Sequence, residues 1–157
     1  MYTCIGAALR FRNEVCGGEA AIREYCHGLA RKGGDRVAAM LGTEVLNDSE
    51  GFLRQCCFAN VRVPLSIVPD PDKAAVAQGA WIVDGVILVS EVPKVLAWWY
   101  ETAANEYDTY LQTSFYNGAF YIRFSAQVYV EMADFEWGAR TVLKLCERVK
   151  KGEWKKV

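Results

Sequence analysis

The chain has 157 residues, 52% of them hydrophobic and 13% aromatic, with a formal net charge of -1. This length suits one domain with a substantial core, and the composition excludes an intrinsically disordered chain. The small net charge argues against nucleic acid or an anionic membrane as the main partner. The longest apolar stretch, residues 80–89, contains Asp84 and is too short to cross a bilayer.

The first part of the chain predicts two helices. Residues 5–15 carry apolar side chains at helical spacing and predict a short amphipathic helix. Residues 19–41 give the longest helical pattern, which the pair Gly33-Gly34 is expected to weaken or kink. Gly42 is the expected C-cap.

The middle of the chain is less regular. Residues 53–65 are rich in β-branched and aromatic side chains and predict a strand that Pro64 closes. A loop follows at residues 69–72. In residues 80–90, the pair Asp84-Gly85 lies between two apolar runs, which indicates a hairpin; an irregular buried insertion is the alternative.

The last part predicts a helix, a hairpin and a second helix. The helix covers residues 92–111, and residues 112–116 are expected to pair with a strand at 118–131 across an Asn117-Gly118 turn. Asp134 is expected to cap the last helix. The whole chain therefore predicts a single α+β domain, residues 1–157, with a small antiparallel sheet of three to four strands and helices on one face.

The strand at residues 118–131 has the strictest alternation in the chain. Its expected buried face carries Ile122, Phe124, Ala126, Val128 and Val130, and its other face carries Arg123, Ser125, Gln127 and Tyr129. An arginine can hold a carboxylate through two parallel charge-assisted hydrogen bonds, which lysine cannot copy. The second face is therefore a candidate anion-binding face built around Arg123, and a solvated sheet face is the alternative.

Other candidate residues carry weaker signals. Arg62 is either a second anion contact or half of a surface ion pair. His27, the only histidine, lacks a suitable partner for general-base catalysis. Glu106 and Asp108 are expected to be solvated carboxylates. No complete catalytic set or nucleotide-binding motif is present.

The six cysteines are irregularly spaced, with no CxxC pair. No histidine is placed to complete a zinc site, so no metal site is predicted. Small buried thiols in a reduced, cytoplasmic protein are the expected arrangement.

Four segments together carry a family resemblance. These are residues 16–43, CCFANVRVPL (56–65), YDTYLQ (107–112) and residues 121–149. They resemble the C-terminal part of fold-type I pyridoxal-phosphate (PLP) enzymes of the class V aminotransferase group. Within that group, the chain is most similar to the fungal branch of isopenicillin-N-epimerase-like proteins and hercynylcysteine sulfoxide lyases. Residues 67–93 depart from the family pattern and form an atypical insertion.

The resemblance implies a small domain that closes over PLP carried by a large domain. It also implies that a strand arginine holds the substrate's α-carboxylate, and Arg123 in RFSAQVY matches that position. The family's Schiff-base lysine and other cofactor-binding residues lie in the large domain, which is expected to precede Met1 and to be absent. The chain is therefore expected to be catalytically incomplete and not to bind PLP tightly alone. A PLP adduct on it would require a reactive lysine among Lys32, Lys73, Lys94 and Lys144.

The implied substrate is a cysteine-like amino acid. Carbon–sulfur lyase (or desulfurase), aminotransferase and epimerase chemistry all stay open. The alternative is a non-catalytic binding or assembly domain that retains the fold. Exposed aromatic side chains on residues 92–111 would favour such association and a homo-oligomer.

Overall fold

Three antiparallel strands form the centre of the computed structural model, which describes residues 4–71 and 85–156. Their order is β1 (Phe58–Arg62), β5 (Ala119–Ser125) and β4 (Thr113–Tyr116). Separately, β2 (Ser66–Val68) and β3 (Val86–Leu88) pair in parallel. The antiparallel sheet confirms the predicted α+β class.

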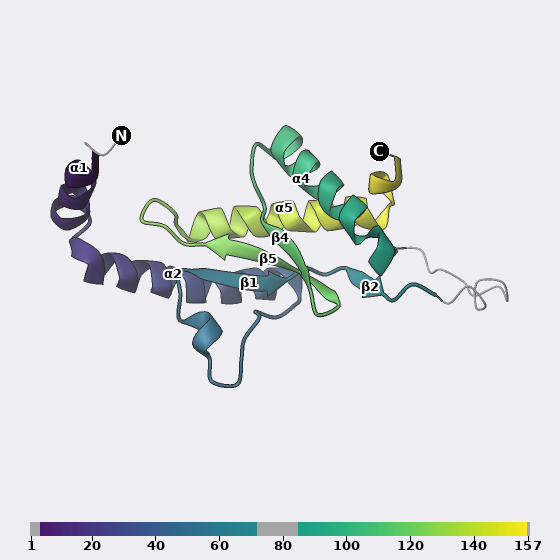
Figure 1. Ribbon diagram of the computed structural model, residues 1–157, viewed down its shortest axis with the longest axis horizontal. Helices are drawn as coiled ribbons and strands as arrows, with labels where there is room; N and C mark the ends of the chain where they lie inside the picture. The colour runs from purple at the N-terminus through teal and green to yellow at the C-terminus, as the bar shows by residue number, and fades with distance from the viewer. Residues whose placement is uncertain (1–3, 72–84, 157) are drawn as a thin grey trace.

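Long helices cover one face of the sheet. They are α2 (Gly18–Leu41) and α5 (Met132–Lys150), with α4 (Val92–Tyr107) lying against α5 and β4 (Figure 1). Single-turn helices η3 (Phe52–Arg54), η4 (Val89–Glu91) and η5 (Glu153–Lys156) complete the body. The buried sheet residues Ala59, Val61, Ile122 and Phe124 meet these helices because alternate side chains of a strand share one face. Helices on one face of the sheet are therefore confirmed. In the described part of the chain, no helix combines the length and apolarity that a bilayer crossing requires.

Helix α2 runs without interruption through Gly33 and Gly34, so the predicted kink is wrong. These glycines are contact points: a Cβ at Gly33 would meet the Phe135 ring, and one at Gly34 would lie 2.5 Å from the Ala59 Cβ. Tertiary packing of α2 on α5 and β1 thus outweighs the weak helix propensity of glycine. Gly42 ends the helix with φ 66°, as predicted.

The β4–β5 hairpin confirms the predicted Asn-Gly turn. Asn117 and Gly118 have φ 45° and 77°, the left-handed pair that a two-residue hairpin turn requires. The turn sets the register, so that Ser114 lies opposite Tyr121.

Strand β5 ends at Ser125, earlier than the alternation predicted. The Val130 N–H donates to the Gln127 carbonyl at 3.0 Å, which closes a turn before α5. Val128 is 41% exposed and Tyr129 is 82% exposed, so the prediction that Val128 is buried is wrong. Alternating residues also occur in turns, and here the chain must reverse to begin the next helix.

Two other elements are shorter than predicted. The strand expected over 53–65 is limited to β1, because Asp48 accepts hydrogen bonds from the Phe52 and Leu53 N–H groups and holds η3 in its place. Helix α4 ends at Tyr107, where Asp108 adopts φ 48° and turns the chain towards β4.

The predicted hairpin at residues 80–90 lies partly outside the described residues. Its described part includes β3, which pairs in parallel with β2. The N-cap of α5 is Glu131, and Asp134 contributes from the third helical position by accepting the Glu131 N–H at 2.8 Å. Trp137 of this helix is 44% exposed.

The N-terminal helical segment confirms the prediction for residues 5–15. It consists of α1 (Ile5–Arg10) and the π-helical turn η2 (Phe11–Val15), and neither contains a buried residue. Figure 1 shows α1 projecting from the start of α2, away from the sheet. Its apolar side therefore contacts no core among the described residues.

Arg148 ties three elements together at the other end of the molecule. From α5 its guanidinium donates to Glu106 of α4 at 2.7 and 3.0 Å and to Glu153 of η5 at 2.7 Å. It also lies over the Trp98 ring, 5.2 Å from its centroid. Hydrogen bonding to Arg148 lowers the pKa of Glu106.

We expect Arg148→Met to destabilise the fold by about 1 kcal/mol, because a bidentate pair and a cation–π contact are lost while the apolar stem is kept. Folding lowers the pKa of Glu106. The ion pair therefore stabilises the fold at pH values above the pKa that Glu106 has in the unfolded chain, and this stabilisation is lost as the pH falls through the pKa of Glu106 in the folded chain. The melting-temperature difference from the wild type should therefore shrink on acidification. The control, Arg140→Met, removes an exposed 3.8 Å pair with Glu136 and should change little at either pH.

Candidate functional site

The open face of the sheet carries the predicted anion-binding residue. Arg123 lies on the central strand β5, directly opposite Asn60 of β1, and its side chain is exposed. Its backbone N–H donates to the Gln112 carbonyl at 2.8 Å, which fixes the strand against the segment before β4. The guanidinium lies 5.7 Å from the centroid of the Phe58 ring. The backbone hydrogen bond to Gln112 and the Phe58 ring therefore position this side chain.

Arg123 lines a cavity of about 210 Å³ between the three strands and the Leu46 segment. The other lining residues are Leu46, Asn60, Gln112, Ser114, Tyr116 and Tyr121. The amides of Asn60 and Gln112 and the hydroxyls of Ser114 and Tyr121 are all capable donors. The cavity thus places neutral donors around one cation, a combination suited to a small carboxylate.

No carboxylate of the described residues lies within 4.0 Å of the Arg123 guanidinium. Arg62, on the same open face, differs: it pairs with Glu44 at 3.0 Å. The structure therefore favours the surface ion pair for Arg62 and leaves Arg123 as the anion-binding candidate.

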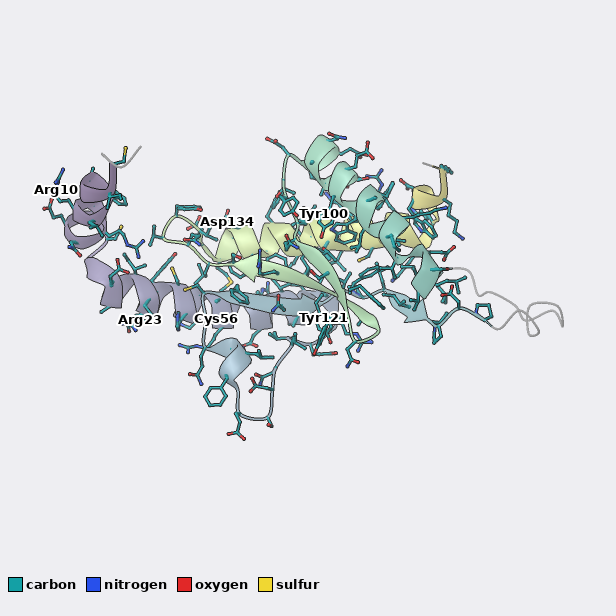
Figure 2. The ribbon with its side chains drawn as sticks, viewed as in Figure 1. Arg10, Arg23, Cys56, Tyr100, Tyr121 and Asp134 are labelled. Atoms are coloured by element: carbon teal, nitrogen blue, oxygen red, sulfur yellow. The ribbon has the colours of Figure 1, made fainter. Side chains whose placement is uncertain are left out.

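Arg123 also borders a second cavity, of about 260 Å³, towards α5. This cavity includes Ser125, Trp137 and Asp134, whose carboxylate is already engaged at the helix start. Figure 2 shows Tyr121 near the β4–β5 turn and Asp134 at the opposite end of β5. The cavity on the Tyr121 side is the better carboxylate site, because it combines the arginine with several donors and no acidic residue.

The sequence pattern predicted Arg123, which lines this candidate cavity, and did not predict the other residues that line it. Ser125 shares the open face but borders only the second cavity, while Gln127 and Tyr129 lie beyond the strand end. The missed residues are cross-strand neighbours. Ser114 could have been found from the Asn-Gly turn, which sets its register against Tyr121. Asn60 could not, because no local signal pairs β1 with β5.

The weaker candidates gain no support. His27 makes no hydrogen bond to a carboxylate within the described ranges. Glu106 is not a free solvated carboxylate, because it pairs with Arg148. A search of residues 4–71 and 85–156 for clusters of metal-ligating side chains finds none.

The chain's own residues do not fit a complete PLP site. Lys32, Lys94 and Lys144 are exposed, and none lines the Arg123 cavity. Lys73 lies outside the described residues. A lysine that reacts with a carbonyl needs a desolvated or cation-flanked position close to the substrate, and these three lack one.

A third hollow is apolar and lies at the N-terminal end of α2. It has a volume of about 550 Å³ and is lined by Phe11, Val15, Cys16, Ala21, Ile22, Tyr25, Val128 and Tyr129. We call it the apolar groove. By contrast, Trp98 and Trp99 on α4 are buried, so the expected aromatic surface on residues 92–111 is largely absent; Tyr110, at 67% exposure, is the exception.

Comparison with known proteins finds relatives that are named for cysteine or cysteine-derived substrates. The chain is 38% identical over 154 residues to the L-cysteine desulfhydrase-like proteins lolT1 and lolT2 of Epichloe uncinata, covering 94% of this chain. It is 29% identical over 145 residues, 92% of its length, to the hercynylcysteine sulfoxide lyase of Schizosaccharomyces pombe. No family model matches the sequence.

These alignments use only part of each relative. They cover 33% of lolT1, 32% of lolT2 and 29% of the sulfoxide lyase, so the chain spans about a third of the length of the curated relatives it matches. Over nearly all of its own length, the chain is therefore a homologue of part of the L-cysteine desulfhydrase-like and hercynylcysteine sulfoxide lyase proteins, which confirms the family resemblance.

Proposed function

We propose that the chain is the substrate-carboxylate-binding portion of a PLP-dependent enzyme that cleaves a carbon–sulfur bond in a cysteine-like amino acid. The observation that carries the proposal is the 38% identity, over 94% of this chain, to proteins named L-cysteine desulfhydrase-like. The relatives' names favour carbon–sulfur cleavage over transamination. A reduced, cytoplasmic setting belongs to the proposal, supported by the six free cysteines.

In this proposal, Arg123 holds the α-carboxylate and fixes the orientation of the amino acid. Asn60, Gln112 and Ser114 line the same cavity and supply further donors. Bound PLP supplies the electron sink for the chemistry, and the residues that hold it belong to the rest of the enzyme. The part played by this chain is positioning, which lowers the entropic cost of reaching the reactive geometry.

A chimera tests the proposal directly. The segment of lolT1 that aligns with this chain is replaced by the chain, and sulfide release from L-cysteine is compared with that of unmodified lolT1. We expect the chimera to bind PLP, fold cooperatively and release sulfide. A folded, PLP-loaded chimera with no activity, beside an active parent, would contradict the proposal.

The apolar groove favours a second candidate, a non-catalytic assembly domain. A helix as short as α1 is not stable alone in water, and none of its residues is buried, so its apolar side needs a covering surface. In this candidate, the occupant of the groove is α1 of a second copy, and each copy supplies its α1 to the other about a two-fold axis.

This candidate predicts a concentration-dependent dimer of the 157-residue chain in sedimentation experiments. Val15, 70% exposed at the groove, provides the test, because Val15→Glu should shift the chain to monomer. The exposed Val89→Glu, at 40% and remote from the groove in sequence, is the matched control. A monomer at all concentrations excludes this second candidate.

A further inference from the structure

A fourth cavity lies at the C-terminal end of α5 and is rich in lysine. It has a volume of about 330 Å³, and among the described residues it shares no lining side chain with the apolar groove or with the two cavities at Arg123. Figure 1 shows this end of α5, followed by the C-terminal turn, at the end of the molecule away from α1. The three ionisable residues that line the cavity are all lysines, so positive charge gathers there. The lining residues are Gly85, Val86, Ile87, Val149, Lys150, Lys151, Gly152, Trp154 and Lys155.

Contacts along its length fix the side chain of Lys155. The stem folds back over Gly152, because a Cβ added to that glycine would lie 3.5 Å from the Lys155 Cδ. The Nζ lies 5.3 Å from the centroid of the Trp154 ring, within reach of a cation–π contact. Trp154 is itself 4% exposed, and its indole N–H donates to the Val149 carbonyl at 3.2 Å. Lys155 therefore rests on an anchored platform.

The start of β3 supplies a further wall of the cavity. Gly85, with φ 85°, lies against α5, since an added Cβ would be 3.9 Å from the Lys150 Cβ and 4.0 Å from the Lys150 carbonyl oxygen. Ile87, two residues further along β3, is 1% exposed. The lysines thus border a space between two separate parts of the chain, α5–η5 and β3.

The lysines of the cavity have no acidic partner in the described part of the chain. Every ion pair found there uses an arginine as its cation. Glu153, which lies between Lys151 and Lys155 in sequence, accepts from Arg148 at 2.7 Å. Glu147, one turn earlier on α5, does not line the cavity. Because like charges repel, an anion in the cavity lowers the electrostatic free energy of the folded chain.

Cations near a helix C-terminus commonly neutralise its last carbonyl groups. At the end of α5, two of these carbonyls have other donors. The Lys151 backbone N–H donates to the Glu147 carbonyl at 3.1 Å. The Val149 carbonyl accepts from the Gly152 N–H at 2.9 Å as well as from the Trp154 indole. The ammonium groups are therefore not needed to cap these two carbonyls, and they are available to an external anion.

We propose that this cavity binds the phosphate group of a small, soluble phosphate ester. A lysine ammonium is a compact charge with three donors, which suits the several acceptor oxygens of a phosphate. A phosphate monoester carries a charge of about -1.5 to -2 at pH 7, so it gains more from three cations than a carboxylate does. The volume is near the lower end of the range for ligand cavities, about 300 Å³, which selects a small molecule. The site is separate from Arg123, and its occupancy does not depend on the proposed enzymatic function.

Isothermal titration calorimetry of the folded 157-residue chain with glycerol 3-phosphate tests the site. We expect one binding site per chain and no heat of binding with glycerol. The double variant Lys151→Gln/Lys155→Gln should weaken binding by at least about tenfold, because two charge-assisted contacts are lost. The matched control is Lys32→Gln/Lys144→Gln, which removes the same charge from exposed positions outside the cavity and should change the Kd by less than about twofold.

Two further measurements locate the site and identify the source of the phosphate. Lysine acetylation mapped by mass spectrometry should show that glycerol 3-phosphate protects Lys151 and Lys155 but not Lys32 or Lys144. Co-sedimentation with vesicles that contain phosphatidic acid distinguishes a lipid headgroup from a soluble ester, and we expect no co-sedimentation. Circular-dichroism melts show that both double variants are folded. An absence of binding at millimolar glycerol 3-phosphate, equal weakening by the two double variants, or binding to vesicles alone overturns the proposal.

Discussion

Arg123→Ala should lower kcat/KM of the lolT1 chimera by about 10- to 150-fold. The range follows from a loss of about 1.5–3 kcal/mol, typical of hydrogen bonds to a charged group. The guanidinium is positioned by Phe58 and by the β5 backbone, and no described carboxylate neutralises it. Its removal therefore takes away the only cation among the described residues that line the donor-rich cavity.

Two variants make the result specific. Arg123→Lys keeps the charge but lacks the planar fork, so it should recover only part of the lost kcat/KM. Arg62→Ala removes an arginine from the same sheet face, where it pairs with Glu44, and should leave kcat/KM within about twofold of the chimera because exposed pairs contribute little. Equal effects of Arg123→Ala and Arg62→Ala, in folded proteins, would exclude a carboxylate clamp at Arg123.

Gly34→Ala should destabilise the fold, although alanine is the better helix former. The added Cβ would lie 2.5 Å from the Ala59 Cβ, whereas carbon atoms normally stay about 3.5–4.0 Å apart. Neither Cβ can rotate away, because the backbone fixes both, so α2 must move off β1. We expect a net loss of about 1–3 kcal/mol, larger than the helix-propensity gain of up to about 1 kcal/mol.

Gly28→Ala is the matched control on the same helix. A Cβ at Gly28 meets nothing within 4 Å, so only the propensity gain operates and the variant should be more stable by roughly 0.5–1 kcal/mol. Urea unfolding followed by circular dichroism measures both changes. A gain of stability in both variants would show that the contact between α2 and β1 is looser than described.

Local signals predicted the elements whose boundaries are set locally. Gly42, with its left-handed conformation, and the Asn117-Gly118 turn were identified because one or two residues determine each structure. The continuity of α2 through Gly33-Gly34 could not be read in this way. It depends on Phe135 and Ala59, which come from distant parts of the chain and need space beside the helix. The early end of β5 has a similar cause, since the return of the chain into α5 overrides an alternation that continues past Ser125.

The candidate site shows the same contrast between residues that local sequence predicts and residues that depend on distant parts of the chain. The alternation around Arg123 correctly placed the arginine on the open face, with Ser125 beside it. The wall formed by Asn60 and Gln112 depends on sheet order, in which β5 lies between two strands from separate regions of the sequence. The alternation along a strand determines which face each side chain occupies, but it does not determine which strands lie beside it. These residues therefore join the cavity wall only through the pairing of the strands.

The two-residue turn between β4 and β5 has a consequence for insertions and deletions. Surface turns commonly tolerate a changed length, because little depends on their conformation. Here the turn fixes Ser114 against Tyr121, and side chains alternate along β5 with a period of two. A one-residue slip in β5 would exchange its faces, bringing Arg123 into the core and Ile122 or Phe124 to the solvent. The tip of this hairpin, beside the end of the cavity that Tyr116 and Tyr121 line, is therefore sensitive to insertions and deletions, because it determines which side chains can reach the cavity.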